Sequence, residues 1–170
     1  MDGVLREEGE TLKGLRALEV ERTFIFLKPE AIMRGLIGEI ISRLERKGLT
    51  ITAMKLARMT REQAERLYEM HRGKHFYERL VARVTEAPVL LMVVEGPRAV
   101  ATVRSLIGST DPLEAKPGTI RGDYALLTGR NIIHAADSPE NAEREISIFF
   151  TEDEILKYRK PAEARYLYVE

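Results

Sequence analysis

The chain has 170 residues, with 27 basic and 27 acidic side chains and no cysteine. A chain of this length can bury enough apolar surface to fold as one domain without disulfides or a structural metal. The lack of cysteine excludes disulfide frameworks, thiolate metal sites and cysteine nucleophiles. The zero net charge argues against a protein that holds nucleic acid mainly by bulk electrostatics. No apolar run reaches the about 18 residues of a membrane span and no signal peptide is recognisable, so the sequence predicts a cytoplasmic protein.

The first 20 residues differ in composition from the rest of the chain. They are rich in charge and glycine, and they carry only a weak apolar stripe at Leu12, Leu15 and Leu18. We therefore predict an N-terminal extension over residues 1–20 and a single domain over residues 21–170.

From residue 23 onward the apolar pattern predicts alternating strands and helices. Short apolar or alternating runs predict strands at 23–27, 49–58, 89–94 and 124–128. Apolar residues at helical spacing, together with capping and stop signals, predict helices at 35–47, 60–70, 76–85, 97–107 and 138–149.

The predicted order of elements is β-α-β-α-α-β-α-β-α. Hairpin turns are missing, so helices that cross one face of the sheet must join the strands. This order predicts an α+β fold of the ferredoxin-like kind, a four-stranded antiparallel sheet covered by helices. Residues 108–123 form a predicted loop that is long enough to suggest a functional role.

Neither of the glycine-rich phosphate-binding motifs, G-x-x-x-x-G-K-[ST] or G-x-G-x-x-G, occurs in the chain. A nucleotide would therefore have to be held by cationic side chains. The predicted loop supplies Lys116 and Arg121, with Arg104 before it and Arg130 after it. Each of these charges taken alone is more typical of a solvated surface.

The chain has three histidines. His71 and His75 have the i, i+4 spacing of a metal pair, but Gly73 interrupts the helix and a third ligand is missing, so a solvated loop is the favoured interpretation. His134 follows a predicted strand and a Thr-Gly turn and precedes a predicted helix. That is a position where functional sites form, although a satisfied loop histidine is the commoner case.

Three separated segments closely resemble the nucleoside diphosphate kinase family. They are Glu21-Arg22-Thr23 with Lys28-Pro29, Lys116-Pro117-Gly118-Thr119-Ile120-Arg121-Gly122-Asp123, and Asn131-Ile132-Ile133-His134 with Asp137-Ser138. The resemblance extends from about Glu21 to Glu170. It implies a ferredoxin-like βαββαβ core, a homo-oligomer, and transfer of the γ-phosphate of a nucleoside triphosphate such as ATP to nucleoside diphosphates. The transfer is a ping-pong reaction through a phosphohistidine, with Mg²⁺ bound through the nucleotide phosphates.

The resemblance also implies a role for individual residues. His134 matches the phosphorylated histidine, Glu145 the carboxylate that orients its ring, and Tyr68 a neighbour of the histidine. The positions that match the phosphate ligands are Lys28, Arg104, Thr110 and Arg121. Asn131 matches a contact to the sugar, Phe76 the aromatic ring on which the base stacks, and Thr128 the small residue across the base. Without the resemblance, core packing would be the favoured interpretation of Phe76.

Two features depart from the family pattern. Ala136 stands where the family commonly has serine, so no role of that serine transfers to this chain. Family members usually begin near Glu21, and Val20 stands where an initiator encoded by an alternative start codon would fall, so we hypothesise that the native protein begins at residue 20. The C-terminal residues Tyr166-Leu167-Tyr168-Val169-Glu170 resemble hexameric relatives more than tetrameric ones.

The competing class is a catalytically silent, ferredoxin-like nucleotide-binding or regulatory module. Retention of His134 together with Lys28, Arg104 and Arg121 favours the enzyme, because a silent module has no use for that set. Binding to nucleic acid is not indicated, since the predicted strands lack the paired aromatic residues of an RNA-recognition sheet. No membrane partner is expected either.

Overall fold

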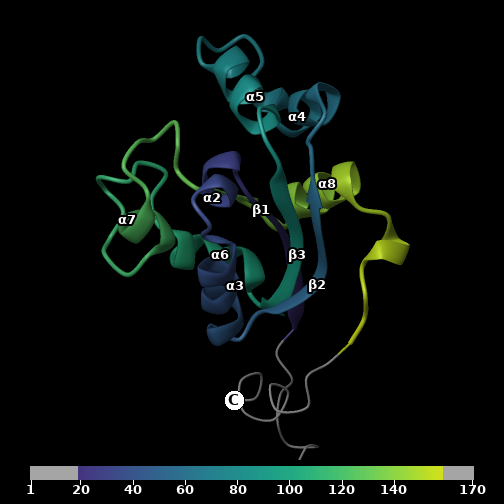
Figure 1. Cartoon of the computed structure of the whole chain (residues 1–170). Helices are drawn as coiled ribbons and strands as arrows, with labels where there is room; N and C mark the ends of the chain where they lie inside the picture. The colour runs from purple at the N-terminus through teal and green to yellow at the C-terminus, as the bar shows by residue number, and fades with distance from the viewer. Residues whose placement is uncertain (1–18, 159–170) are drawn as a thin grey trace, which may run out of the picture.

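The computed structural model describes residues 19–158 of the chain (Figure 1). The strands are β1 (Val20–Leu27), β2 (Thr50–Ala57), β3 (Val89–Pro97) and β4 (Ile133–Ala135). The helices are α2 (Pro29–Met33), α3 (Ile37–Arg46), α4 (Arg61–Leu67), α5 (Tyr77–Thr85), α6 (Ala99–Ile107), α7 (Ile120–Tyr124) and α8 (Pro139–Phe149). Two short 3₁₀ helices, η2 (Glu69–His71) and η3 (Glu152–Glu154), complete the list. The expected stripe at residues 12–18 and the C-terminal tail at 166–170 lie outside the described residues.

The four strands form one antiparallel sheet in the order β2-β3-β1-β4. The central pair, β1 and β3, is in register from Val20 opposite Pro97 to Leu27 opposite Leu90. This arrangement confirms the predicted α+β, ferredoxin-like class. Within residues 19–158, no helix is long and apolar enough to span a bilayer.

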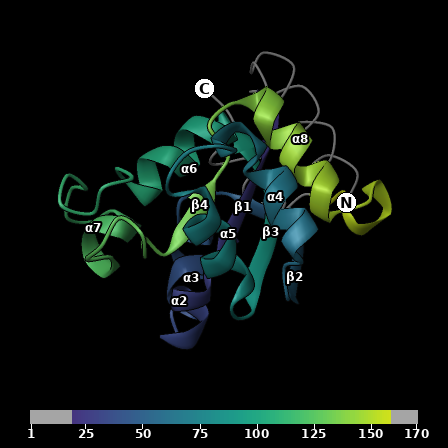
Figure 2. The same cartoon turned by 90° about the horizontal axis from the view of Figure 1, so that it is seen from above.

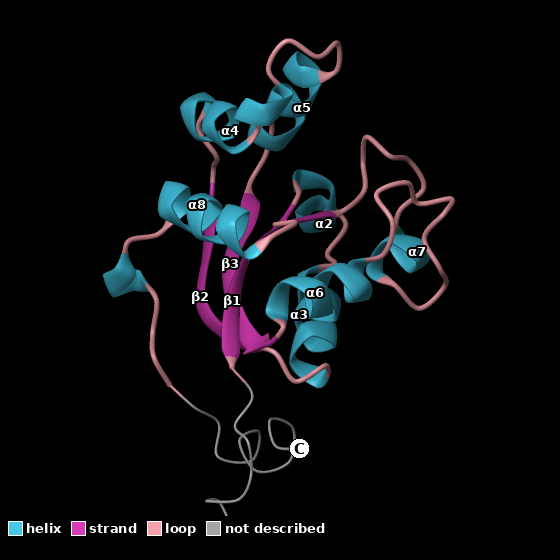
Figure 3. Cartoon of the chain, turned by 180° about the vertical axis from the view of Figure 1, so that it is seen from behind, coloured by secondary structure: helices cyan, strands magenta, loops and turns pink. Residues whose placement is uncertain are grey.

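Helices cover both faces of the sheet, and each face has its own core. Because successive side chains of a strand alternate, Phe24 and Phe26 of β1 join a core with α4, α5 and α8, whereas Ile25 and Leu27 join a core with α3 and α6. The views in Figures 2 and 3 place α8 on one side of the sheet and α3 and α6 on the other. The expectation of helices on one face therefore holds for α3 and α6, and it is wrong for the α4–α5 pair that joins β2 to β3.

The fourth strand is not at residues 124–128, where the sequence predicted it. The strand is β4, Ile133–Ala135, which pairs with Ile25, Phe26 and Leu27 of β1. The predicted loop 108–123 contains the start of α7, whose first turn is capped by the Thr119 side chain. A three-residue strand has no alternating pattern to detect, so only its pairing with β1 defines it.

Three smaller boundaries also differ from the prediction. Pro29 opens the short helix α2, which the sequence analysis missed. The helix predicted for 60–70 ends at Leu67, and η2 follows it. Pro97 belongs to β3 rather than to a helix start, because Arg98 takes up a left-handed conformation (φ 50°) that separates β3 from α6.

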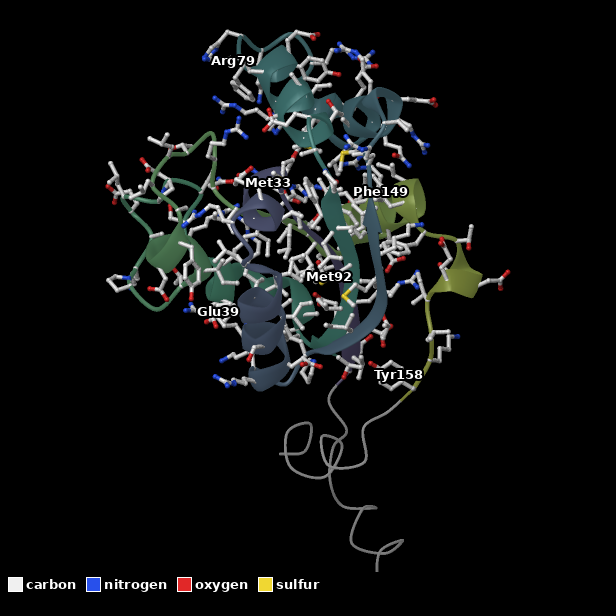
Figure 4. The ribbon with its side chains drawn as sticks, viewed as in Figure 1. Met33, Glu39, Arg79, Met92, Phe149 and Tyr158 are labelled. Carbon is white, nitrogen blue, oxygen red and sulfur yellow. The ribbon has the colours of Figure 1, made fainter. Side chains whose placement is uncertain are left out.

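Helix α8 begins at Pro139, and the Ser138 side chain accepts a hydrogen bond from the Asn141 amide as the N-cap. Its inner face buries Ile146 and Phe149, of which Phe149 is labelled in Figure 4. The Phe149 ring stacks on Phe24 of β1 with 5.0 Å between centroids. These contacts fix the rotation of α8, so that the one acidic residue on its inner face, Glu145, points toward the sheet.

We expect Ser138→Ala to lower the free energy of unfolding by about 1 kcal/mol, because a lost N-cap leaves an amide of the first turn unpaired. Urea denaturation followed by circular dichroism measures the change. Ser147→Ala is the matched control on the same helix, because Ser147 is exposed and its hydroxyl donates to the Arg144 carbonyl within α8 itself. Equal stability of the Ser138 variant and the wild type would contradict the capping role.

Candidate active site

His134 is the central residue of β4 and lies opposite Phe26 of β1. Its ring stacks on Phe26 at 5.2 Å, while its neighbours Ile133 and Ala135 are buried against the other face of the sheet. The sequence analysis expected His134 beyond a strand end, and the structure places it within the edge strand instead. Its side chain keeps 19% of its surface exposed, so it is held in place yet accessible to a ligand.

Glu145 of α8 fixes the orientation of the His134 ring. Its Oε2 lies 2.8 Å from His134 Nε2, and the Glu145 side chain is only 5% exposed. A carboxylate accepts a hydrogen bond, so the proton of the neutral imidazole is assigned to Nε2. Nδ1 therefore carries the free lone pair, which makes it the nucleophilic nitrogen of this ring.

Tyr68 lies edge-on to the His134 ring at 5.9 Å between centroids. Its hydroxyl is buried and has no hydrogen-bond partner among residues 19–158. Burial, and next the charge of Glu145, raise the pKa of Tyr68, so the hydroxyl stays protonated. An unpaired buried donor costs about 1–3 kcal/mol, and this one is available to an acceptor that enters beside the histidine.

Arg121 of α7 is buried beneath the segment that carries His134. Its guanidinium donates to three backbone carbonyls: Gly108 at 3.1 Å, Asn131 at 3.3 Å and Ile133 at 2.8 Å. Burial, and next the charge of Arg104, lower the pKa of Arg121 to about 10, so it remains charged at neutral pH. Since a guanidinium has five N–H donors, two remain for a ligand.

Lys28 and Asn131 form a second polar group next to His134. Lys28 Nζ donates to Asn131 Oδ1 at 2.6 Å, and Asn131 Nδ2 donates to the Thr110 carbonyl at 3.0 Å. This chain of contacts links the end of β1 to the loop after α6. Burial lowers the pKa of Lys28 to about 8, although the nearby Glu30 carboxylate opposes the shift.

The residue between Asn131 and Ile133 is strained. Ile132 has φ 75°, a left-handed conformation that β-branched residues rarely adopt and that costs about 1–3 kcal/mol. Its amide donates to Glu30 Oε1 at 3.1 Å, and its carbonyl accepts from the Lys28 amide at 2.9 Å. These two bonds hold the turn that aims the flanking carbonyls at Arg121.

Phe76 is at the N-cap of α5 and is only partly buried, whereas the adjacent Tyr77 enters the core. Core packing is thus the role of Tyr77 and not of Phe76. Two imidazoles lie against the Phe76 ring, those of His71 and His75, each at 5.4 Å between centroids.

The sequence analysis favoured a solvated loop for His71 and gave it no role in the site. Its ring lies between Phe76 and Tyr68, 6.2 Å from the Tyr68 ring. Partial burial, and next the charge of Lys74, lower the pKa of His71. The sequence feature that could have placed His71 next to Tyr68 is their i, i+3 spacing, which puts both side chains on one side of a helical segment.

The remaining expected residues lie at the edge of this group. Arg104 of α6 is exposed, and its charge adds to the burial that lowers the pKa of Arg121. Thr110 is exposed and joins the group through its carbonyl. Thr128 lies in the exposed turn between Leu127 and Arg130. Arg130 itself is paired with Glu86.

Taken together, hydrogen bonds and ring contacts join His134, Glu145 and Tyr68 in one group and Lys28, Asn131 and Arg121 in an adjoining one. Phe76 connects to the first group through His71. The arrangement combines a positioned nucleophile with buried cations and a partly exposed aromatic ring. Such a combination can transfer a phosphoryl group to and from a nucleotide.

Comparison with known proteins agrees with this chemistry. The family model described as nucleoside diphosphate kinase matches residues 21–155. A nucleoside diphosphate kinase of Thermosipho melanesiensis is 60% identical over 139 residues, which cover 82% of this chain and 95% of that protein. One from Ignicoccus hospitalis is 58% identical over 138 residues, covering 81% and 94%.

Solved structures of nucleoside diphosphate kinases are also similar to this chain. The structure of a halophilic nucleoside diphosphate kinase from Halobacterium salinarum in complex with CDP has a TM-score of 0.83 at 44% identity, covering 86% of this chain and 97% of that one. The enzyme of Encephalitozoon cuniculi has a TM-score of 0.80 at 45% identity, covering 82% and 94%. The chain therefore belongs to the nucleoside diphosphate kinase family.

Proposed function

We propose that this protein transfers the γ-phosphate of a nucleoside triphosphate to nucleoside diphosphates through a phosphohistidine at His134. The observation that carries the proposal is the 2.8 Å contact from His134 Nε2 to Glu145, which leaves Nδ1 as a nucleophile. Family membership and relatives named nucleoside diphosphate kinase support the reaction class. A catalytically silent binding module is not favoured, because it would need neither this nucleophile nor its buried carboxylate partner.

The proposed reaction has two half-reactions. In the first, the Nδ1 lone pair attacks the γ-phosphorus, the P–O bond to the β-phosphate breaks, and the nucleoside diphosphate leaves. In the second, a terminal oxygen of another nucleoside diphosphate attacks the same phosphorus and the P–N bond breaks. Glu145 holds the Nε2 proton throughout and stabilises the ring as it gains positive charge.

Cationic side chains offset the negative charge of the phosphates. Arg121 would use its two free N–H groups and Arg104 its exposed guanidinium, while Lys28 would supply a point charge. The buried Tyr68 hydroxyl and Thr110 are further donors toward phosphate. Asn131 would contact the sugar beside Lys28.

We further propose that the base stacks on Phe76 with Thr128 across from it. The partial exposure of Phe76 and the position of Thr128 at the tip of a turn support this role. Stacking is tolerant of base identity, because every base offers a π-face.

Mg²⁺ would reach the site with the nucleotide. No group of three or more His, Asp or Glu side chains that could hold a metal occurs within residues 19–158. Phosphate oxygens suit this hard cation, which commonly retains several waters. When bound, it neutralises part of the charge on the phosphates.

The expected homo-oligomer, a hexamer rather than a tetramer, also remains a proposal. Exposed apolar side chains support association of copies: Met54 and Leu56 lie on the edge strand β2, and Leu126 and Leu127 line an open pocket of about 460 Å³. The cytoplasmic location and the division into an extension over residues 1–20 and a domain over 21–170 stay predictions from the sequence.

The proposal is tested by incubating the protein with ATP labelled in the γ-phosphate. We expect one acid-labile, base-stable phosphate per chain, which any nucleoside diphosphate then removes. His134→Gln abolishes the labelling and the exchange, and the matched control His75→Ala labels normally. An acid-stable label, or kinetics that require both nucleotides at once, would show that His134 is not the carrier.

Arg104 and Arg121 differ in burial, so their variants should differ in stability. We expect Arg104→Ala to reduce the rate of phosphoryl transfer by about 10- to 150-fold, because one charged hydrogen bond to the phosphate is lost. Thermal stability should change little. Arg121→Ala should reduce transfer by a similar factor and also lower the melting temperature by several degrees, because three carbonyls lose their donor. Steady-state kinetics measures the transfer rates of the two variants, and calorimetry measures their melting temperatures. Equal melting temperatures would refute the predicted difference in stability.

Lys28 should make nucleotide affinity depend on pH. Its pKa is lowered to about 8, so the lysine is charged below pH 8 and loses its charge above it. A cation is needed to bind phosphate, and we therefore expect kcat/KM to fall about tenfold per pH unit above pH 8. In Lys28→Gln this alkaline break disappears and kcat/KM is low throughout. Persistence of the break in that variant would assign it to another group.

A further inference from the structure

The two walls of the proposed base site belong to different parts of the chain. Phe76 caps the N-terminus of α5, and Thr128 lies in the two-residue turn between Leu127 and Arg130. The α4–α5 pair stands at the end of the sheet (Figure 1), so contacts beyond the sheet must set the distance between the walls.

Two contacts connect α5 directly to this turn. Arg83 Nη1 donates to the Gly129 carbonyl at 2.9 Å, and Glu86, the C-cap of α5, forms an ion pair with Arg130. We refer to these two contacts as the α5–turn link. It joins residues that are more than 40 positions apart in the sequence.

Glycine at position 129 is part of this link. A Cβ atom built on Gly129 would overlap the Arg83 guanidinium. Any larger residue would therefore displace Arg83 from the carbonyl. On its other side the turn is tied to the loop after α6, because Thr128 Oγ1 bonds to Asp111 Oδ1 at 3.4 Å.

Phe76 and Arg83 also share one face of α5. They are seven residues apart, almost two full turns, so a shift of Arg83 relative to the turn moves the Phe76 ring relative to Thr128. A neighbouring side of α5 carries Tyr77, Val81 and Val84, which are buried in the core. Core packing therefore anchors one side of α5, and the α5–turn link anchors the side that faces the turn.

We propose that Arg83 and Glu86 are positioning residues that hold α5 against the 127–130 turn and thereby set the width of the slot for the nucleotide base. The inference rests on the proposed function, since it assumes that the base lies between Phe76 and Thr128. Neither residue would touch the reacting atoms.

The test separates base binding from chemistry with two phosphoryl donors. ATP needs the base slot, whereas phosphoramidate carries no nucleoside. With phosphoramidate, the donor P–N bond breaks, ammonia leaves, and a P–N bond forms to His134. A wider slot should weaken the first reaction and leave the second unchanged.

We expect Arg83→Ala to raise the KM for nucleoside diphosphates about three- to tenfold, and Glu86→Gln about two- to fivefold, because its pair is exposed. The kcat and the rate of labelling by phosphoramidate should stay at wild-type values. Matched controls are Arg61→Ala and Glu78→Gln, which break an ion pair between α4 and α5 away from the turn. Both controls should keep the wild-type KM.

An unchanged KM in both Arg83→Ala and Glu86→Gln would overturn the proposal. An equal loss of labelling with ATP and with phosphoramidate would also overturn it, because it would mean that the link supports His134 rather than the slot. Failure of the wild-type protein to take label from either donor would instead refute the assignment of His134.

Discussion

The burial of one guanidinium governs how this site is assembled. Arg121 donates hydrogen bonds to the carbonyl of Gly108, at the end of α6, and to the carbonyls of Asn131 and Ile133, at the start of β4. Burying a cation is costly unless it is hydrogen-bonded, so these two segments converge on the guanidinium. The same side chain therefore holds the backbone around His134 in place and retains two donors for the phosphate contact that we propose.

Strain and burial accompany this convergence. Ile132 keeps an unfavourable left-handed conformation because Glu30 and the Lys28 amide hold it from both sides. Lys28 itself is buried deeply enough that its pKa falls to about 8. The packing of α8 on β1 offsets these costs. Its aromatic core around Phe24 and Phe149 also contains Phe26, the ring on which His134 stacks.

The site thus has a rigid part and an adaptable part. His134 and Glu145 lie between the sheet and α8, where their separation is fixed by packing. Phe76 and Thr128 lie on elements that meet through partly exposed contacts, where Arg83 is the main connection. Precise placement is needed for the proposed nucleophile, whereas the proposed recognition of a base by stacking tolerates a slot held by weaker contacts.

The sequence by itself determined the strands β1 and β3 and the helix α8, because long apolar runs and the Ser138-Pro139 start are local signals. It also determined the family, through motifs whose residue types are read without coordinates. Only the tertiary structure decided the position of β4, since a three-residue strand exists through its pairing with β1. The sequence could not predict which carbonyls bind Arg121, or that His71 lies beside Phe76. Those contacts join residues distant in sequence or separated by an irregular turn, and no local periodicity encodes which groups will meet.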